Sequence, residues 1–520
     1  MSQSNDLGRT ATSAGDSAEK NLAAAASNPF PANFAPRATA SPDAPELGSA
    51  GLASPLPAGG VPANCKVFDA HHPPQEKLIN DCVHCGFCLP TCPTYLLWHE
   101  EMDSPRGRIY LMKMGLEGDV ERMDRTYVQH FDQCLGCMAC VSACPSGVKY
   151  DRLIESTRAQ VERHYRRPLA ERLFRWLIFS LFPHPARLRA MLLPMWLYRR
   201  SGLRWLLRKS GLVRLLPERL QAMESLLPEV SLRSAFSGLP TRIRPQGTPR
   251  MKVGLILGCV QRVFFDDVNL ATARVLAAEG CEVVIPPGQG CCGALSMHAG
   301  REREGLRMAR KMIRLFEREQ VDVIAVNAAG CGSNLKDYGV LLADDPLYAE
   351  RARRFSAKCK DVSVLLAGLE AHAPRHPVPL RVAYHDSCHL QHAMGVRTEP
   401  RKLLATIPKL EVQEIAEAAI CCGSAGIYNL VEPGPAAALG ERKARNIIAV
   451  KPDLLVSGNP GCLLQLRASL SKIGYDIPTM HTIQVLDASI SGGIAAGKPN
   501  GQRRSRQRRG TGGGVRNGKG

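Results

Sequence analysis

The segment DCVHCGFCLPTCP, residues 81–93, places four cysteines in the spacing C-x2-C-x2-C-x3-C followed by proline. The segment DQCLGCMACVSACP, residues 132–145, repeats that spacing. In such paired runs the first three thiolates hold one 4Fe-4S cluster and the fourth crosses to the other cluster. A structural zinc site would instead use two C-x2-C pairs separated by a longer loop. The two segments therefore predict a domain that holds two 4Fe-4S clusters.

The crossing rule divides the eight cysteines into two sets of ligands. The first cysteine set is Cys82, Cys85, Cys88 and Cys144, and the second cysteine set is Cys134, Cys137, Cys140 and Cys92. Clusters that share ligand segments must lie close together, so we expect the domain to transfer electrons from one cluster to the other. This arrangement does not indicate which substrate supplies the electrons. Between the segments, Ser104 followed by Pro105 is typical of the start of a helix. We expect a mostly helical ferredoxin domain over residues 65–160.

The second half of the chain is a duplication, and each copy is about a quarter of the chain long. Four cysteines of the first copy recur in the second in the same order and with almost the same spacing: Cys259, Cys291, Cys292 and Cys331, then Cys388, Cys421, Cys422 and Cys462. Short apolar runs end at or just before the first and last cysteine of each copy, with helical patterns between them. This order predicts two parallel α/β modules, residues 249–375 and 376–490, with sites at the carboxyl ends of the strands. The eight cysteines are a candidate additional metal site.

Two features of the modules suggest other chemistry. GQGCCG at residues 288–293 matches the dinucleotide pattern G-x-G-x-x-G, but AICCG at residues 419–423 keeps the cysteines and loses the earlier glycines. The repeat therefore preserves the thiols, and a flavin or nicotinamide is expected on another chain. Four further side chains beside Cys388 could form a zinc or acid–base site, but the histidines have no counterpart near Cys259, and the group is expected to be structural or to support ligands: His385, Asp386, His389 and His392.

Three cysteines lie outside these patterns, Cys65, Cys281 and Cys359, and we expect them to be buried thiols. Cysteines that fall into metal-binding patterns in so long a chain indicate a reducing compartment, so the cytoplasm is expected. No export signal and no apolar run long enough to span a membrane is present. No catalytic residue is predicted on this chain.

The formal charge of +19 comes from two segments. Residues 163–219 carry a net +12 and residues 497–520 a net +8, so the other domains are close to neutral and no nucleic acid is expected as a partner. Residues 161–248 should form a basic amphipathic helical linker, divided by Pro183, Pro185, Pro194 and Pro217. It could pack on a neighbouring domain or lie on a membrane surface. Residues 1–64 and 491–520 are predicted to be a disordered leader and a disordered basic tail.

Several motifs together resemble one family. The paired cysteine segments, SPRGRIYL at 104–111, CPSGV at 144–148, LQHA at 390–393 and CCGSAG at 421–426 are similar to the iron–sulfur subunit of bacterial glycolate oxidase, also called glycolate dehydrogenase. The resemblance extends from Cys82 to Leu486. It implies two flavin-containing (FAD) partner subunits that oxidise glycolate to glyoxylate. This chain is then expected to pass the electrons toward membrane quinone, with the complex on the inner face of the plasma membrane.

The same superfamily offers alternatives. Related chains serve lactate oxidation, anaerobic glycerol-3-phosphate oxidation and heterodisulfide reduction. The last class carries a noncubane cluster on its Cys-Cys-Gly modules, and there each module ends in C-x2-C. Here Asn334 and Gln465 stand at the final positions. The sequence therefore leaves open whether the modules hold a third cluster, and whether the chain is a self-contained thiol–disulfide reductase.

Overall fold

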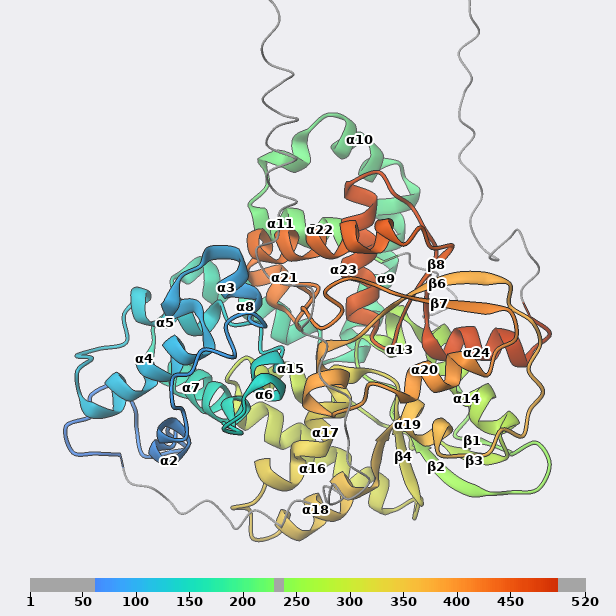
Figure 1. The fold of residues 1–520 in the computed structure, drawn as a ribbon, viewed down its shortest axis with the longest axis horizontal. Coiled ribbons are helices and arrows are strands. Elements are labelled where there is room, and N and C mark those ends of the chain that lie inside the picture. Colours follow the sequence, from blue (N-terminus) through green and yellow to red (C-terminus); the bar gives the residue numbers. More distant parts are fainter. Residues whose placement is uncertain (1–60, 229–237, 494–520) are drawn as a thin grey trace, which may run out of the picture. The chain divides into compact units, whose positions relative to one another are not determined.

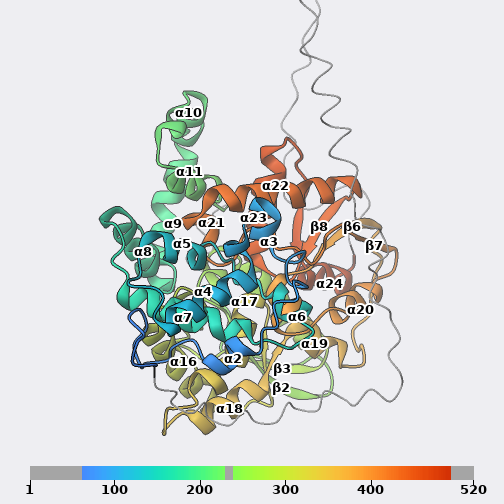
Figure 2. The same ribbon diagram turned by 60° about the vertical axis from the view of Figure 1, so that its left-hand side comes forward.

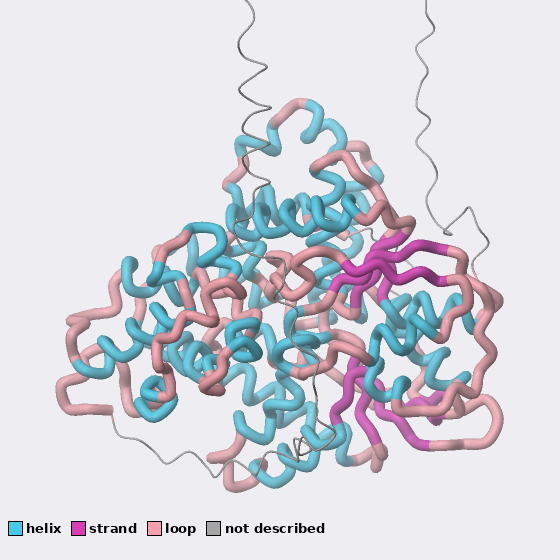
Figure 3. The backbone as a smooth tube through the Cα atoms, viewed as in Figure 1, coloured by secondary structure: helices cyan, strands magenta, loops and turns pink. Residues whose placement is uncertain are grey.

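The computed structural model describes residues 61–228 and 238–493. The predicted disordered leader and tail lie outside these residues, apart from residues 61–64 and 491–493. A helical region is followed by two modules, each built on its own sheet, as Figures 1 and 3 show. Within the described ranges no helix has both the length and the apolar character needed to cross a bilayer.

Residues 61–164 consist of helices and loops without a strand, in agreement with the predicted helical domain. Ser104 begins a helix as predicted, because its Oγ accepts a hydrogen bond from the Gly107 N–H at 3.0 Å and Pro105 is the first helical residue. Ile109, Met112, Phe131 and Ile154 form the centre of the core. The helices are α2 (Glu76–Asn80), α3 (Pro93–Trp98), η1 (Glu101–Asp103), α4 (Pro105–Glu117), α5 (Arg125–Asp132), α6 (Ala139–Ala143) and α7 (Tyr150–His164).

The basic linker is helical: α8 (Leu169–Leu181), α9 (Pro185–Arg200), α10 (Leu203–Lys209), η2 (Leu212–Leu215) and α11 (Glu218–Ser225). Pro183, Pro185 and Pro217 lie at helix boundaries, but the prediction was wrong for Pro194, which lies inside α9. Pro194 is exposed, as is Ala190 four residues earlier, so water can bind the carbonyl oxygen that loses its helical donor. On α8 the side chains of Leu169, Leu173 and Trp176 are exposed on one face.

The first module has the strand order β1-β3-β2-β4-β5, in which only β1 is antiparallel. The strands are β1 (Arg242–Ile243), β2 (Met251–Leu255), β3 (Cys281–Val284), β4 (Val323–Val326) and β5 (Cys359–Asp361). The helices are α13 (Gln261–Phe264), α14 (Asp266–Ala278), α15 (Ala294–His298), α16 (Glu302–Glu317), α17 (Ala329–Leu341), α18 (Ala349–Lys358) and α19 (Val362–Ala367).

The second module has the fully parallel order β7-β6-β8-β9, which repeats the order β3-β2-β4-β5 of the first. The duplication read from the cysteine spacing is therefore a duplication of the fold. The strands are β6 (Leu380–His385), β7 (Leu410–Glu414), β8 (Leu454–Ser457) and β9 (Thr479–His481). The helices are η3 (His389–Ala393), α20 (Glu399–Ala405), α21 (Tyr428–Val431), α22 (Pro433–Ala449), α23 (Pro460–Lys472) and α24 (Thr482–Ile490).

One apolar core joins the two modules. It includes Leu255 of β2, Val275 of α14, Tyr384 of β6 and Leu486 of α24, so helices of both modules fill the space between the sheets (Figures 1 and 2). The opposite face of each sheet packs against α16, α17 and α18 in the first module, and against α22 and α23 in the second. In both modules the cysteines follow the carboxyl ends of the strands, where parallel sheets form their sites.

Candidate metal centres

The first cysteine set lies at the protein surface. Cys82, Cys85, Cys88 and Cys144 line one cavity, together with Arg106 and with Cys140, which belongs to the second cysteine set. Cys85 is exposed, and the neighbouring side chains of Val83 and Phe87 are 68% and 59% exposed. Gly86 is required beside it, because its φ is +85° and an added Cβ would meet Arg106 Nη1 at 2.9 Å. The fold thus brings the predicted first set together, Cys144 included, around a cavity that faces solvent.

The second cysteine set is buried, with each side chain less than one tenth exposed. Cys134 Sγ accepts hydrogen bonds from the Gly136 N–H at 3.3 Å and the Tyr150 hydroxyl at 3.6 Å. Burial opposes its thiolate, yet the guanidinium groups of Arg108 and Arg158 hold the pKa of Cys134 below its usual value. Burial raises the pKa of Cys137 and Cys140 well above the usual value, since no such partner compensates for lost water.

Arg108 is the largest fully buried side chain of the described residues. Its guanidinium lies 3.2 Å from the carboxylate of Asp103 and 3.2 Å from Thr94 Oγ1, and it also donates to the His130 carbonyl. A buried guanidinium beside Cys134 and Cys92 places a positive charge where a thiolate-bound cluster is negative.

The second cysteine set lies directly against the second module. Cys137 packs in one buried apolar cluster with Cys388 and Cys421. Ser142 Oγ, near Cys140 in the chain, is 2.7 Å from His392 Nδ1, whose Nε2 is 3.0 Å from the Ala419 carbonyl oxygen. The ferredoxin domain and the second module therefore place cysteines of two predicted sites in one buried cluster.

In the first module Cys259, Cys291 and Cys292 are buried and Cys331 is partly buried. Hydrogen bonding to Cys291 and burial raise the pKa of Cys259 well above its usual value. Asn334 replaces the thiolate expected from the C-x2-C pattern, and its Nδ2 donates to the Cys292 carbonyl at 3.0 Å. The amide thus supports the backbone of the cysteine pair.

In the second module all four cysteines are buried, and Cys388 Sγ lies 4.0 Å from Cys421 Sγ. Gln465 stands at the position of the absent thiolate, where its Nε2 donates to the Ala436 carbonyl at 3.0 Å. Cys462 Sγ accepts from Asn459 Nδ2 at 3.1 Å. A ring nitrogen of His385 and the sulfurs of Cys422 and Cys462 lie within 4.8 Å of one another. These donors fit a metal or cluster, and sequence reasoning treated His385 only as a structural or supporting residue.

The other side chains singled out from the sequence have defined partners. Asp386 pairs with Arg401 at 2.7 Å, which fits the predicted structural role. Cys281 and Cys359 are buried as predicted. The prediction was wrong for Cys65, which is partly exposed because it lies at the edge of the helical domain, where its thiol donates to the Gly115 carbonyl at 3.2 Å.

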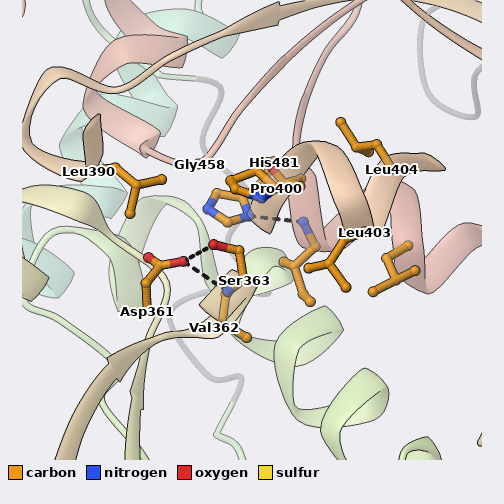
Figure 4. A pocket seen from close by; sticks show the side chains of 12 residues that line it. Asp361, Val362, Ser363, Leu390, Pro400, Leu403, Leu404, Gly458 and His481 are labelled. Carbon is orange, nitrogen blue, oxygen red and sulfur yellow. Dashed lines mark hydrogen bonds between the residues drawn. The ribbon is translucent and has the colours of Figure 1, made fainter. Parts of the chain in front are cut away.

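Figure 4 shows a small pocket between η3, α19 and α20 that is separate from the cysteines. Burial raises the pKa of Asp361, at its wall, to about 6, while Ser363 opposes this shift by donating to Asp361 Oδ1 from both its N–H and its hydroxyl. His481 Nδ1 accepts from the Ile483 N–H at 3.1 Å. Leucines and Pro400 form much of the remaining wall, and no cysteine lines it, so this pocket offers no thiol to a metal.

Four segments of the chain match three known families. Residues 78–148 match a family described as a 4Fe-4S dicluster domain, and residues 253–336 and 382–467 match one described as a cysteine-rich domain. Residues 170–227 match the linker region of the glycolate oxidase iron-sulfur subunit. The repeat found in the strands and the repeat found by these matches are the same.

Known proteins share parts of the sequence over different lengths. A probable glycolate oxidase iron-sulfur subunit of Bacillus subtilis is 42% identical over 418 residues, which cover 79% of this chain and 94% of the relative. The glycolate oxidase iron-sulfur subunit of Escherichia coli is 34% identical over 76% of this chain and 91% of its own length. Lactate utilization protein A of Exiguobacterium is 29% identical over 46% of this chain and 98% of its own.

Proposed function

The chain belongs to the family of glycolate oxidase iron–sulfur subunits, and from this membership we propose that it is the electron-transfer subunit of a glycolate-oxidising complex. Flavin-containing partner subunits oxidise glycolate to glyoxylate, and this chain carries the electrons toward a quinone. The observation that carries the proposal is the pair of cysteine sets, one at the surface and one buried against the second module.

The first cysteine set holds one 4Fe-4S cluster and the second cysteine set holds the other. Bound clusters supply one-electron carriers, which divide the two electrons released when glycolate becomes glyoxylate. The residues fit such groups. Gly136 and Tyr150 donate hydrogen bonds to Cys134, and Arg108 and Arg158 balance negative charge near the buried set. The apolar core around the buried set excludes water.

The surface at the first cysteine set is the contact for a redox partner. Val83 and Phe87 are large apolar side chains that remain exposed on either side of Cys85. Exposed apolar residues beside a cofactor site are typical of a protein interface. An electron entering here would pass inward to the second cysteine set.

The linker brings the complex to the cytoplasmic face of the plasma membrane. Leu169, Leu173 and Trp176 form an exposed apolar face on α8, and Lys209 lies 4.7 Å from the ring of the exposed Trp205. Apolar and aromatic side chains among arginines suit the headgroup region of an anionic bilayer. Co-sedimentation with anionic vesicles should fall when Leu173 and Trp176 are both changed to Ser, and should be unchanged for Leu347→Ser, a similarly exposed control outside the linker.

The functional test is an anaerobic pull-down of the full chain from its host. The expected result is co-purified flavin, followed by bleaching of the iron–sulfur absorbance when glycolate is added and not when glycerol 3-phosphate is added. Bleaching by lactate in place of glycolate would assign the chain to a lactate-oxidising complex. Flavin without bleaching by any hydroxy acid would contradict the proposal.

A second candidate is a self-contained thiol–disulfide reductase, which the 4.0 Å separation of Cys388 Sγ and Cys421 Sγ favours. Oxidation of the Cys388 and Cys421 thiols to a disulfide would supply the two electrons and two protons that convert a substrate disulfide to two thiols. Disulfide reduction by the isolated chain, lost in Cys421→Ser, would support this candidate.

A further inference from the structure

The two modules share a fold and four cysteines, but they differ at two positions beside those cysteines. His385 stands three positions before Cys388, where the first module has Ile256 before Cys259. Lys443 follows the cysteine pair of its module at the same separation along the chain as Ile313 follows the pair of the first module. Ile256 and Ile313 are fully buried in the same apolar cluster as the cysteines of the first module. Two apolar side chains of the first module are thus replaced by a donor and a cation in the second.

His385 is placed as a ligand would be. It is the last residue of β6, its side chain is buried, and its Nδ1 has no hydrogen-bond partner among the described residues. An orphaned imidazole nitrogen in a protein interior is costly, so most buried polar groups find a partner. The ring instead lies with Cys422 and Cys462, all three donor atoms being within 4.8 Å of one another. Imidazole and thiolate are the donors that zinc and iron centres use.

Lys443 gives the same site a positive charge. It lies on α22, is 2% exposed, and its Nζ donates to the Glu417 carbonyl oxygen, while its charge acts on Cys421 and Cys422. A buried lysine is rare unless a negative group compensates for its lost hydration. Thiolates of a metal centre would provide that negative group.

We propose that the second module holds an iron–sulfur centre in which a ring nitrogen of His385 is a ligand together with Cys422 and Cys462. This inference rests on the proposed function, in which the chain is an iron–sulfur protein. The new centre would be the third in the chain and would lie next to the second cysteine set, because Cys137 packs in one buried cluster with Cys388 and Cys421. The four sulfurs and the nitrogen are more donors than one zinc ion takes, and histidine replaces cysteine as a ligand in some iron–sulfur clusters. The first module has Ile256 at this place and offers no nitrogen ligand there.

The test uses the full chain, reconstituted anaerobically with iron and sulfide, and measured by iron analysis and by pulsed electron paramagnetic resonance in both oxidised and dithionite-reduced forms. We expect more iron than the roughly eight atoms of two 4Fe-4S clusters, with a strong 14N coupling of the kind a bound imidazole gives. His385→Ala should lose both the additional iron and the coupling. His385→Cys should keep the iron and lose the coupling, because a thiolate replaces the imidazole.

The matched control is His389→Gln, since His389 Nδ1 lies 3.6 Å from Cys388 Sγ in the same module. This variant should keep both the iron and the coupling. Iron that does not exceed eight, an absent coupling, or a coupling that survives in His385→Cys would overturn the inference. The readout is independent of the partner subunits. Bleaching by glycolate in a protein without the coupling would therefore defeat only this inference, and the coupling without any response to glycolate would defeat only the proposed function.

Discussion

The two cysteine sets of the ferredoxin domain have the same spacing in the sequence and opposite surroundings in the fold. The first set lines a cavity open to solvent, with Cys85 exposed. The second set is enclosed by the helical core and touches the second module at Cys388 and Cys421. The comparison teaches that a repeated motif specifies which atoms can bind metal, while the side chains around it decide which set meets a partner and which passes electrons inward.

Two arginines on α4 show the same contrast. Arg106 pairs with Glu101 near the surface at 2.6 Å, beside the first cysteine set. Arg108, two residues later, is completely buried with Asp103 beside the second cysteine set. A surface pair contributes little to stability, whereas removing one partner of a buried pair leaves an uncompensated charge.

The largest expected effect follows from breaking the buried pair. Arg108→Met should lower the free energy of unfolding by about 3 kcal/mol, because Asp103 loses its buried guanidinium partner and keeps only neighbours such as His130 Nδ1 at 3.0 Å, and the second cysteine set should lose iron. Arg106→Met is the matched control and should cost no more than about 1 kcal/mol. Anaerobic denaturant unfolding with iron analysis of each variant checks this. Equal losses for the two variants would remove the distinction between the sets.

The second prediction concerns removal of the metal. Ferricyanide with an iron chelator should release iron in two phases, and the fast phase should come from the first cysteine set because Cys85 is exposed. We expect the phases to differ by at least about tenfold in rate, which corresponds to about 1.4 kcal/mol of protection. Cys85→Ser should remove the fast phase, and Cys137→Ser should reduce only the slow phase, to which a centre in the second module would also contribute. A single phase would show that burial does not protect the second set.

Much of this architecture could be predicted from the sequence because it depends on local rules. Ser104 and Pro105 favour the start of a helix through their own side chains. The order of strand, helix and cysteine recurs in the two modules at nearly constant spacing. The candidate cysteine ligands were all named in advance, since thiol spacing is a property of the chain alone, whereas His385 was expected only to be structural or to support ligands.

The surroundings of those ligands could not be predicted, because they depend on contacts between distant segments. The contact of Cys137 with Cys421 joins residues that are far apart in the chain, and no periodicity signals it. The ring nitrogen of His385 reaches Cys462 only through the pairing of β6 with β8. Pro194 within α9 shows the same limit, since its tolerance depends on exposure to water.

The third prediction tests the role of the exposed rim at the first cysteine set. Phe87→Ser should slow reduction of the chain by its flavin partner about fivefold, because a large apolar contact of an interface is lost. Iron content should be unchanged, since Phe87 binds no metal. Stopped-flow bleaching with glycolate in the assembled complex measures the rate. Leu347→Ser is the control, because Leu347 is 75% exposed in the first module. Equal rates for both variants would place the partner elsewhere.

The smallest expected effect is the pH dependence of the surface pair. Hydrogen bonding from Arg106 holds the pKa of Glu101 below its usual value of 4.5. The folded state therefore binds a proton on Glu101 less readily than the unfolded state, so the pair stabilises the fold above about pH 4.5 and this contribution disappears as the pH falls through the lowered pKa. Because the carboxylate is 41% exposed, water screens the pair and the contribution stays below about 1 kcal/mol. Unfolding free energies measured from about pH 6 to about pH 4 should fall slightly more steeply for the unchanged chain than for Glu101→Gln. Parallel curves would contradict this prediction and would mean that the Arg106–Glu101 pair adds nothing measurable to the free energy of unfolding. The stabilising effect would then belong to the buried Arg108–Asp103 pair alone.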